Sequence, residues 1–311
     1  MPQMTPAQAR VLDPILTTVA QGYQNGELIF PALFPVVPVD QRGGQIIQFG
    51  REDFRLYSTA RAPGAATKRI QFGYSGNHFA LGAYALEGQV PLESMQDASA
   101  VPGIDLGRIA VLKVQNIITL ANEVAAAALA TDAARYPTHN KVTLSGSSQW
   151  SDPASRPSQD IQDAIEAVRS AVGKRANTVV LGPKVWSALR QHPAIIDRIK
   201  YTGRDSITLD MLAALWDVAR VRVGDALYED AGGNLADVWG KHVIVAYTDI
   251  GTLQNAGLPS YGYTYRLRHY PIVETPYQDR NAKSWIYPVT DELAAVTASI
   301  SAGFLLSGVV A

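Results

Sequence analysis

The stretch from Asp105 to Arg135 constrains the fold most strongly, because it carries the longest helical hydrophobic period in the chain. Its apolar residues recur every three to five positions and predict one buried stripe: Leu106, Ile109, Val114, Ile117, Leu120, Val124 and Ala128. Asp105 is placed to cap the N-terminus, and Pro137 stops the helix, since proline restrains Tyr136 away from helical dihedrals. About 30 residues at 1.5 Å each would form a rod of roughly 45 Å. Such a rod fits either a core helix or a strut that joins separate lobes. We expect the strut, because the segment before it is long, extended and a poor candidate for a compact domain.

Residues 29–39 (IFPALFPVVPV) form a proline-rich apolar segment ahead of this helix. Three prolines at this spacing exclude a helix and a central strand. Apolar side chains such as Phe30 and Phe34 nonetheless favour burial. We predict an extended arm that lies on a neighbouring subunit, with Phe30 and Phe34 in the intersubunit contact.

Residues 44–92 have the pattern of a long β excursion, with a turn-rich tip at 58–67 (STARAPGAAT). A limb of about 12–15 extended residues would reach roughly 40–50 Å. A two-stranded hairpin is only marginally stable alone in water, so we expect it to rest on a neighbour. Its charges are concentrated relative to the long helix, and we take four of them as candidate intersubunit contacts: Arg55, Arg61, Lys68 and Arg69. The alternative is a solvated loop face that contributes little to stability.

The second half of the chain alternates helices and short apolar strands. Helical patterns cover 159–171, 183–191, 193–200 and 208–216, and strand patterns cover 177–181, 218–223 and 243–247. This alternation predicts a compact α/β lobe. From Tyr261 onward the pattern is strand-dominated, with a hairpin of 263–274 and 284–288 and a last extended run at 293–310.

Composition excludes several classes of function. The net charge of −1 provides no basic footprint for nucleic acid or anionic lipid. The absence of cysteine excludes disulfides, thiolate metal sites and cysteine catalysis. The N-terminal residues lack the pattern of a signal peptide, and the apolar run 304–311 is too short to span a bilayer, so we expect a soluble protein made in the cytoplasm.

No pattern of catalytic or ligand-binding residues is visible. Gly173-Lys174 and Gly240-Lys241 lack the other residues of a phosphate-binding loop, and there is no nucleophile elbow. The five histidines are scattered, with no pair at metal-ligand spacing. We therefore predict no catalytic residue, no metal site and no cofactor.

Three stretches carry a resemblance to a known family: residues 30–39, residues 144–152 (LSGSSQWSD) and residues 177–189 (NTVVLGPKVWSAL). Together with the order of elements, they make the chain resemble the major capsid proteins of tailed bacteriophages, which have the HK97-type fold. The resemblance implies an α+β fold with an N-terminal arm, an extended β-hairpin (the E-loop), a long spine helix, a peripheral β-sheet domain and an α/β axial domain. It divides the chain into an arm (1–43), the E-loop (44–100), the spine helix and peripheral domain (101–150), the axial domain (151–260), and return strands of the peripheral domain with a C-terminal strand (261–311).

The resemblance implies a shell protein that self-assembles into hexamers and pentamers of an icosahedral head around the DNA genome. Its implied partners are copies of itself, separate scaffolding and portal proteins, a possible decoration protein and, weakly and non-specifically, packaged double-stranded DNA, but no membrane. Its implied place is the virion, after assembly in the cytoplasm of the host bacterium. If the arm lies on a neighbour, a chain without residues 1–40 should give folded subunits that fail to close shells.

Some members of this fold join neighbours by a lysine–asparagine isopeptide bond, for which Lys68 and Asn281 are the residues available here. We do not expect this crosslink, because no buried glutamate can be placed beside them. Two other readings stay open from the sequence: an encapsulin-type nanocompartment shell, and a cytoplasmic α/β enzyme built on residues 159–250.

Overall fold

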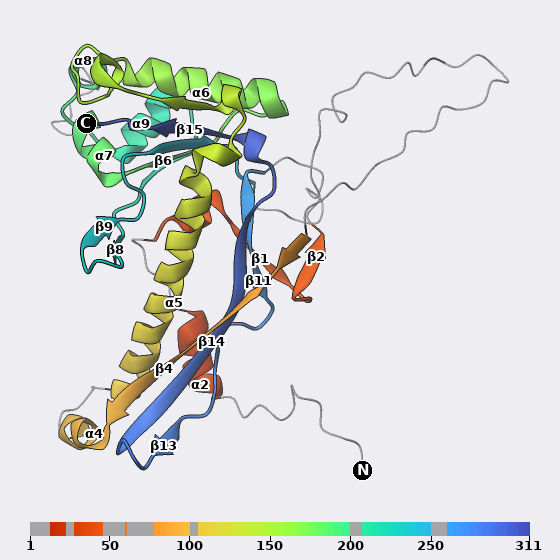
Figure 1. Ribbon diagram of the computed structural model, residues 1–311, viewed down its shortest axis with the longest axis vertical. Helices are drawn as coiled ribbons and strands as arrows, with labels where there is room; N and C mark the ends of the chain where they lie inside the picture. Colours follow the sequence, from red (N-terminus) through yellow and green to blue (C-terminus); the bar gives the residue numbers. More distant parts are fainter. Residues whose placement is uncertain are drawn as a thin grey trace.

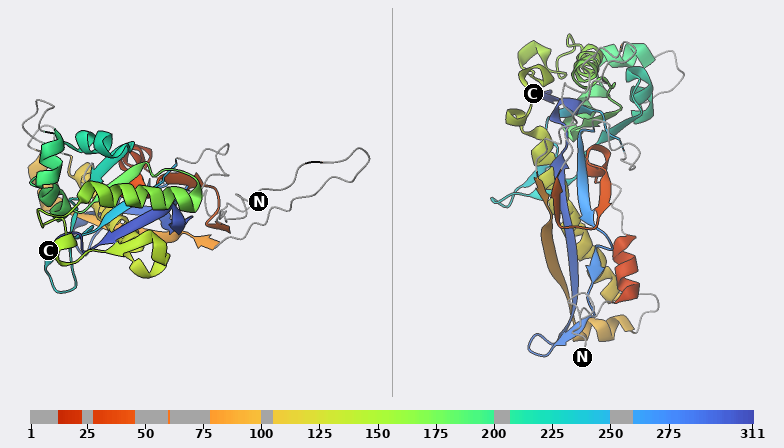
Figure 2. Two further views of the ribbon diagram at one scale, coloured as in Figure 1. Left: turned by 90° about the horizontal axis from the view of Figure 1, so that it is seen from above. Right: turned by 90° about the vertical axis from the view of Figure 1, so that its right-hand side faces the viewer.

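The computed structural model describes residues 13–22, 28–45, 60, 78–99, 105–199, 207–249 and 260–311. These residues form a long, narrow body with an α/β lobe at one end and a long sheet that runs to the other (Figure 1 and Figure 2). Helix α5 (Leu106–Thr131) lies along the sheet and meets the lobe at its C-terminal end (Figure 1). The expected strut is therefore present, although one of its faces is also packed against a sheet.

Helix α5 begins where the sequence predicts. The Asp105 carboxylate accepts the N–H of Arg108 at 3.0 Å, as an N-cap does. The helix ends at Thr131, earlier than Pro137 requires, because Asp132 leaves the helical conformation and caps the next short turn, Ala133–Arg135.

The buried face of α5 differs from the predicted stripe. Of the predicted stripe, Val114 is buried, together with Val111 and Ile118 beside it, whereas Ile109 and Ile117 are 41% and 54% exposed. Small residues explain the difference: Gly107 lies so close to the Tyr287 ring that an added Cβ would be 2.6 Å from its hydroxyl. The face toward the sheet therefore combines a close approach at Gly107 with buried Val111, Val114 and Ile118.

Helix α5 is also the one helix of the described chain that is long and apolar enough to cross a membrane, by length and composition only. A core helix of a soluble protein passes the same test, so this is weak evidence. The helix also buries Gln115, Asn122 and Glu123, and the Glu123 carboxylate has three protein donors.

The long sheet is built around strand β14 (Ser284–Thr297). One side of β14 pairs along its length with β4 (Gly82–Pro91), and the other side pairs in turn with β13 (Tyr277–Asp279), β12 (Ile272–Val273) and β11 (Gly262–Leu267). Strand β1 (Val36–Val39) adds to β11 in parallel and forms an edge. Two further helices, α2 (Pro14–Gln21) and α4 (Leu92–Ser99), lie at the end of the body away from the lobe (Figure 1).

Two predictions for the N-terminal half are corrected here. Residues 30–33 form a one-turn helix, α3 (Phe30–Leu33), which accommodates Pro31 in its first turn because the missing N–H has no helical partner there. Residues 82–91, predicted as part of the hairpin's return limb, instead form β4 and pair with β14 over ten residues. The exclusion of a central strand is confirmed, since Pro38 lies in the edge strand β1.

The lobe contains a five-stranded sheet in the order β5–β15–β10–β6–β7. Its strands are β5 (Lys141–Thr143), β15 (Gly303–Ser307), β10 (Val243–Ala246), β6 (Thr178–Leu181) and β7 (Arg220–Val223). Its helices are α6 (Pro157–Val172), α7 (Pro183–Leu189), α8 (Pro193–Ile199) and α9 (Leu209–Trp216). These elements of residues 157–246 agree with the predicted alternation to within a few residues.

The sequence did not place β5 and β15 in this lobe. Strand β15 nevertheless lies inside the sheet, parallel to β5 and antiparallel to β10. Its run of Phe304, Leu305 and Leu306 is buried, and a strand without a polar side requires cover on both faces. Two small hairpins complete the fold: β2 (Gly43–Gln45) with β3 (His78–Ala80), and β8 (Leu227–Glu229) with β9 (Leu235–Asp237).

Candidate assembly surface

The β2–β3 pair, or hairpin base, joins the two described segments that flank residues 46–77 in the sequence. Gly43 pairs with Ala80 and Gln45 with His78 in antiparallel register. The Leu81 N–H donates to the Arg42 carbonyl at 2.8 Å and closes the base on the side of the body. An antiparallel start is what the sequence predicts for a long hairpin over this region.

An aromatic stack fixes this base to the long sheet. The rings of Phe79 and Tyr265 lie 4.2 Å apart and nearly parallel, at 21°. Gly44 packs against the same phenylalanine ring, where an added Cβ would lie 2.8 Å from Phe79 Cε1. The base is therefore held in one orientation on β11.

Two ion pairs hold the residues just before β2. Arg42 donates to both carboxylate oxygens of Glu292 on β14, at 2.6 and 2.9 Å, and this contact raises the pKa of Arg42. Arg268 donates to Asp40 at 2.6 Å, and its hydrogen bond lowers the pKa of that carboxyl. Sequence analysis missed all four residues, since no local pattern links positions more than 200 residues apart.

Phe30 and Phe34, which the sequence predicts in an intersubunit contact, lie in the core of their own subunit. Phe34 is fully buried and Phe30 is 5% exposed, both in the main core of their own subunit. Phe34 packs on Tyr261 with 5.4 Å between ring centroids, and Gly262 approaches it closely. The arm is apolar because it completes the subunit's own core, so no surface of Phe34 is left for a neighbour.

A buried carboxylate joins this segment to the helix and to the lobe. Glu123, on α5, accepts the N–H groups of Ile29 and Phe30 at 3.1 and 2.8 Å and the indole N–H of Trp239 at 2.6 Å. Burial raises the pKa of Glu123, while the three donors act in the opposite direction. A glutamate in an alanine-rich helix gave no sequence signal for this junction.

The remaining predicted contact residues, Arg55, Arg61, Lys68 and Arg69, lie outside the described residues, so their role stays a prediction. The isopeptide pair is untested for the same reason. Asn281, its possible second member, lies in the turn between β13 and β14, where its N–H donates to Asp279 at 2.8 Å.

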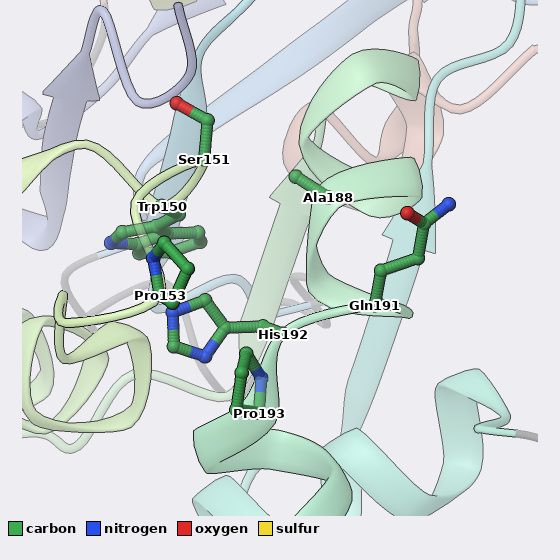
Figure 3. Close-up of a pocket in the computed structure, with 7 residues that line it drawn as sticks. All are labelled: Trp150, Ser151, Pro153, Ala188, Gln191, His192 and Pro193. Atoms are coloured by element: carbon green, nitrogen blue, oxygen red, sulfur yellow. The ribbon is translucent and has the colours of Figure 1, made fainter.

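A cavity of about 340 Å³ on the lobe is lined in part by His192 (Figure 3). Outside that lining, His192 meets Ser155 in a close histidine–serine pair. His192 Nε2 lies 3.0 Å from Ser155 Oγ. However, the Ala194 N–H donates to His192 Nδ1 at 3.2 Å, so Nδ1 is the acceptor and Nε2 carries the proton. This histidine donates toward Ser155 and the Asp152 carbonyl and cannot take the serine proton as a general base. His192 thereby caps the start of α8, and Ser155 holds its ring.

Metal binding finds no support in the part of the chain that is described, since no group of three histidine, aspartate or glutamate side chains there could hold an ion.

Comparisons with known proteins agree with this geometry. Residues 115–254 match the family model described as phage major capsid protein E. The major capsid protein of Burkholderia phage BcepMu is 35% identical over 97% of this chain and 98% of its own length. A phage-related protein from Bordetella bronchiseptica RB50, solved by crystallography, is 47% identical, covers 97% of this chain and 98% of its own, and superposes with a TM-score of 0.82.

More distant structures show the fold alone. The capsid of cyanophage P-SCSP1u is 11% identical and has a TM-score of 0.57 over 99% of this chain and 92% of its own. The chain therefore has the HK97-type α+β fold that the sequence predicts. The named relatives are structural proteins rather than enzymes, which overturns the reading of residues 159–250 as an enzyme. The chain belongs to the family of phage major capsid proteins.

Proposed function

We propose that copies of this protein form hexamers and pentamers of an icosahedral head that encloses double-stranded DNA, and that residues 46–77 of each subunit clasp a neighbour. Self-assembly into the shell of the virion follows from the family. The observation that carries the finer proposal is the base of the hairpin. The β2–β3 pair is fixed on the sheet by contacts of Phe79, Arg42 and Gly44. The two ends of segment 46–77 are therefore held in a defined position, from which the segment can contact a neighbour.

The other partners belong to the same proposal. Assembly takes place in the cytoplasm of the host bacterium, with separate scaffolding and portal proteins, and a decoration protein can bind the finished shell. Contact with the packaged DNA is weak and non-specific, since the net charge of −1 offers no excess of cations for phosphate binding.

The test is a loop replacement. A variant in which a short Gly-Ser linker joins Gln45 to His78 keeps the β2–β3 pair and all described residues except residue 60. By negative-stain microscopy, we expect closed shells or capsomer rings for the wild type and only dispersed subunits for the variant. The thermal stability of the variant should be unchanged. Normal shells from the linker variant would contradict the clasp, and the absence of any shell or ring from the wild type would contradict self-assembly under these conditions.

A further inference from the structure

The β8–β9 hairpin is a two-stranded sheet that stands apart from the two larger sheets. Leu227 pairs with Asp237, Tyr228 with Ala236 and Glu229 with Leu235, and no third described strand joins them. It projects from the lobe on the side of α5 (Figure 1). Such a hairpin gains little stability from its own pairing and is expected to rest on another surface.

The outward face of this hairpin is apolar and acidic. Residues paired across an antiparallel ladder share a face, so Leu227, Glu229, Leu235 and Asp237 lie together. Leu235 is 74% exposed and Leu227 is 48% exposed, while the other face is half-buried. Glu229 is exposed, and Asp237 is the acid of a 3.8 Å pair with Lys184. Two exposed leucines beside carboxylates form a surface suited to an apolar and cationic partner.

The chain contains a segment of matching chemistry. Residues 46–77 carry five basic residues against two acidic ones, within a chain whose net charge is −1: Arg51, Arg55, Arg61, Lys68 and Arg69 against Glu52 and Asp53. They also contain apolar and aromatic residues. Opposite charge on two surfaces of this kind steers association and fixes its register.

The placement of the two elements favours a second copy as the partner. The β2–β3 base and the β8–β9 hairpin lie on opposite sides of the body (Figure 1). Two different patches on opposite sides of one subunit produce a heterologous contact, which repeats around a ring. We propose that the outward face of β8–β9 receives the basic segment 46–77 of the neighbouring subunit. This inference rests on the proposed clasp and names its acceptor.

Disulfide trapping tests the contact. Because the chain has no cysteine, only the introduced cysteines can form a crosslink. Leu235→Cys is combined in turn with Ser58→Cys, Ala62→Cys or Ala66→Cys, and assembled particles are oxidised and run on a non-reducing gel. At least one pair is expected to convert most of the protein into covalent multimers, in shells but not in dispersed subunits. The matched control is Ala236→Cys, on the same strand but the other face, which should crosslink at least tenfold less.

The outcomes separate this inference from the proposed function. A wild type that forms no shells refutes the proposed function. Shells in which no Leu235→Cys pair crosslinks, or in which Ala236→Cys crosslinks equally, refute the acceptor while leaving the shell intact. Crosslinking of the Leu235→Cys single variant to itself would instead show a hairpin–hairpin contact and also overturn the inference.

Charge reversal provides a second measurement that needs no cysteine. Glu229→Lys should raise the lowest protein concentration that supports assembly about tenfold, and one of Arg61→Glu or Lys68→Glu should restore it in the double variant. Asp97→Lys makes the same charge change on exposed α4 and should leave that concentration within about twofold. A Glu229→Lys variant that assembles like the wild type would contradict the acceptor.

Discussion

The carboxylate of Glu123 accepts the backbone N–H of Phe30 at 2.8 Å, in the core of the subunit. A side chain on the spine helix thereby fixes the backbone of the N-terminal segment, and the same carboxylate holds Trp239 of the lobe. Three parts of the fold meet at one buried acid.

Removing this acid should destabilise the subunit strongly. Glu123→Ala leaves the N–H groups of Ile29, Phe30 and Trp239 without their acceptor, and buried unpaired donors are costly. We expect a loss of about 3 kcal/mol or more in the free energy of unfolding, measured by urea denaturation. Glu123→Gln keeps one acceptor oxygen and should lose less; equal losses for the two variants would contradict the role of the hydrogen bonds.

Glu123 should make the subunit more stable at lower pH, which is opposite to the usual effect of a carboxyl group whose pKa is lowered on folding. Its pKa in the folded state is raised above 4.5, so the stability it contributes is full below the unfolded pKa and is lost as the pH rises through the folded pKa. The free energy of unfolding of the wild type should therefore rise relative to that of Glu123→Gln as the pH falls from 7 toward 4.5. Denaturation of both proteins at several pH values measures this, and a constant difference would refute it.

Phe34 should act on the folding of the single subunit, and not on assembly alone. Phe34→Ala empties a fully buried position beside Tyr261 and should cost about 3–5 kcal/mol, measured on dispersed subunits. A chain without residues 1–40 loses this side chain together with β1, so it should fail to fold stably, contrary to the sequence prediction. Unchanged unfolding of Phe34→Ala subunits would restore the original interface interpretation.

The face of α5 can be tested with two substitutions whose expected effects reverse the sequence prediction. Gly107→Ala adds a helix-favouring residue but places a Cβ 2.6 Å from the Tyr287 hydroxyl, so it should destabilise by about 1–3 kcal/mol. Ile117→Ala truncates a side chain that is 54% exposed and should change stability by no more than about 0.5 kcal/mol. A larger loss of thermal stability for Ile117→Ala than for Gly107→Ala would show instead that the predicted stripe lies in the core.

The ion pairs at the hairpin base should differ in strength because they differ in burial. Arg42 contacts Glu292, which is 5% exposed, whereas Arg268 contacts Asp40, whose side chain is 73% exposed. Arg42→Ala should therefore lower the urea midpoint, and Arg268→Ala should change it little, since exposed pairs are screened. Equal midpoints for the two variants would show that the Arg42 pair adds nothing to stability.

Local patterns predicted the local structure well. The Asp105 cap, the buried side of α6 with Ile161, Ile165 and Val168, and the buried strand β6 all follow from neighbouring residues in the sequence, and all are confirmed. These features depend on backbone hydrogen bonds and side-chain spacing within a few turns, which periodicity reports directly.

Long-range choices were not predictable in the same way. Periodicity could not tell which face of α5 would pack, because close approach at Gly107 depends on Tyr287, and it could not pair Arg42 with Glu292. The apolar character of Phe30 and Phe34 indicated burial, but not whether their own subunit or another one would cover them. Such outcomes depend on contacts between distant segments, for which a single sequence carries no local signal.

The position of β15 between β5 and β10 has a consequence for synthesis on the ribosome. The lobe cannot close its sheet until Ser307 has emerged, because β5 and β10 have no direct ladder to each other. A chain cut short before Gly303 would therefore leave β5 without the strand that joins it to the rest of this sheet.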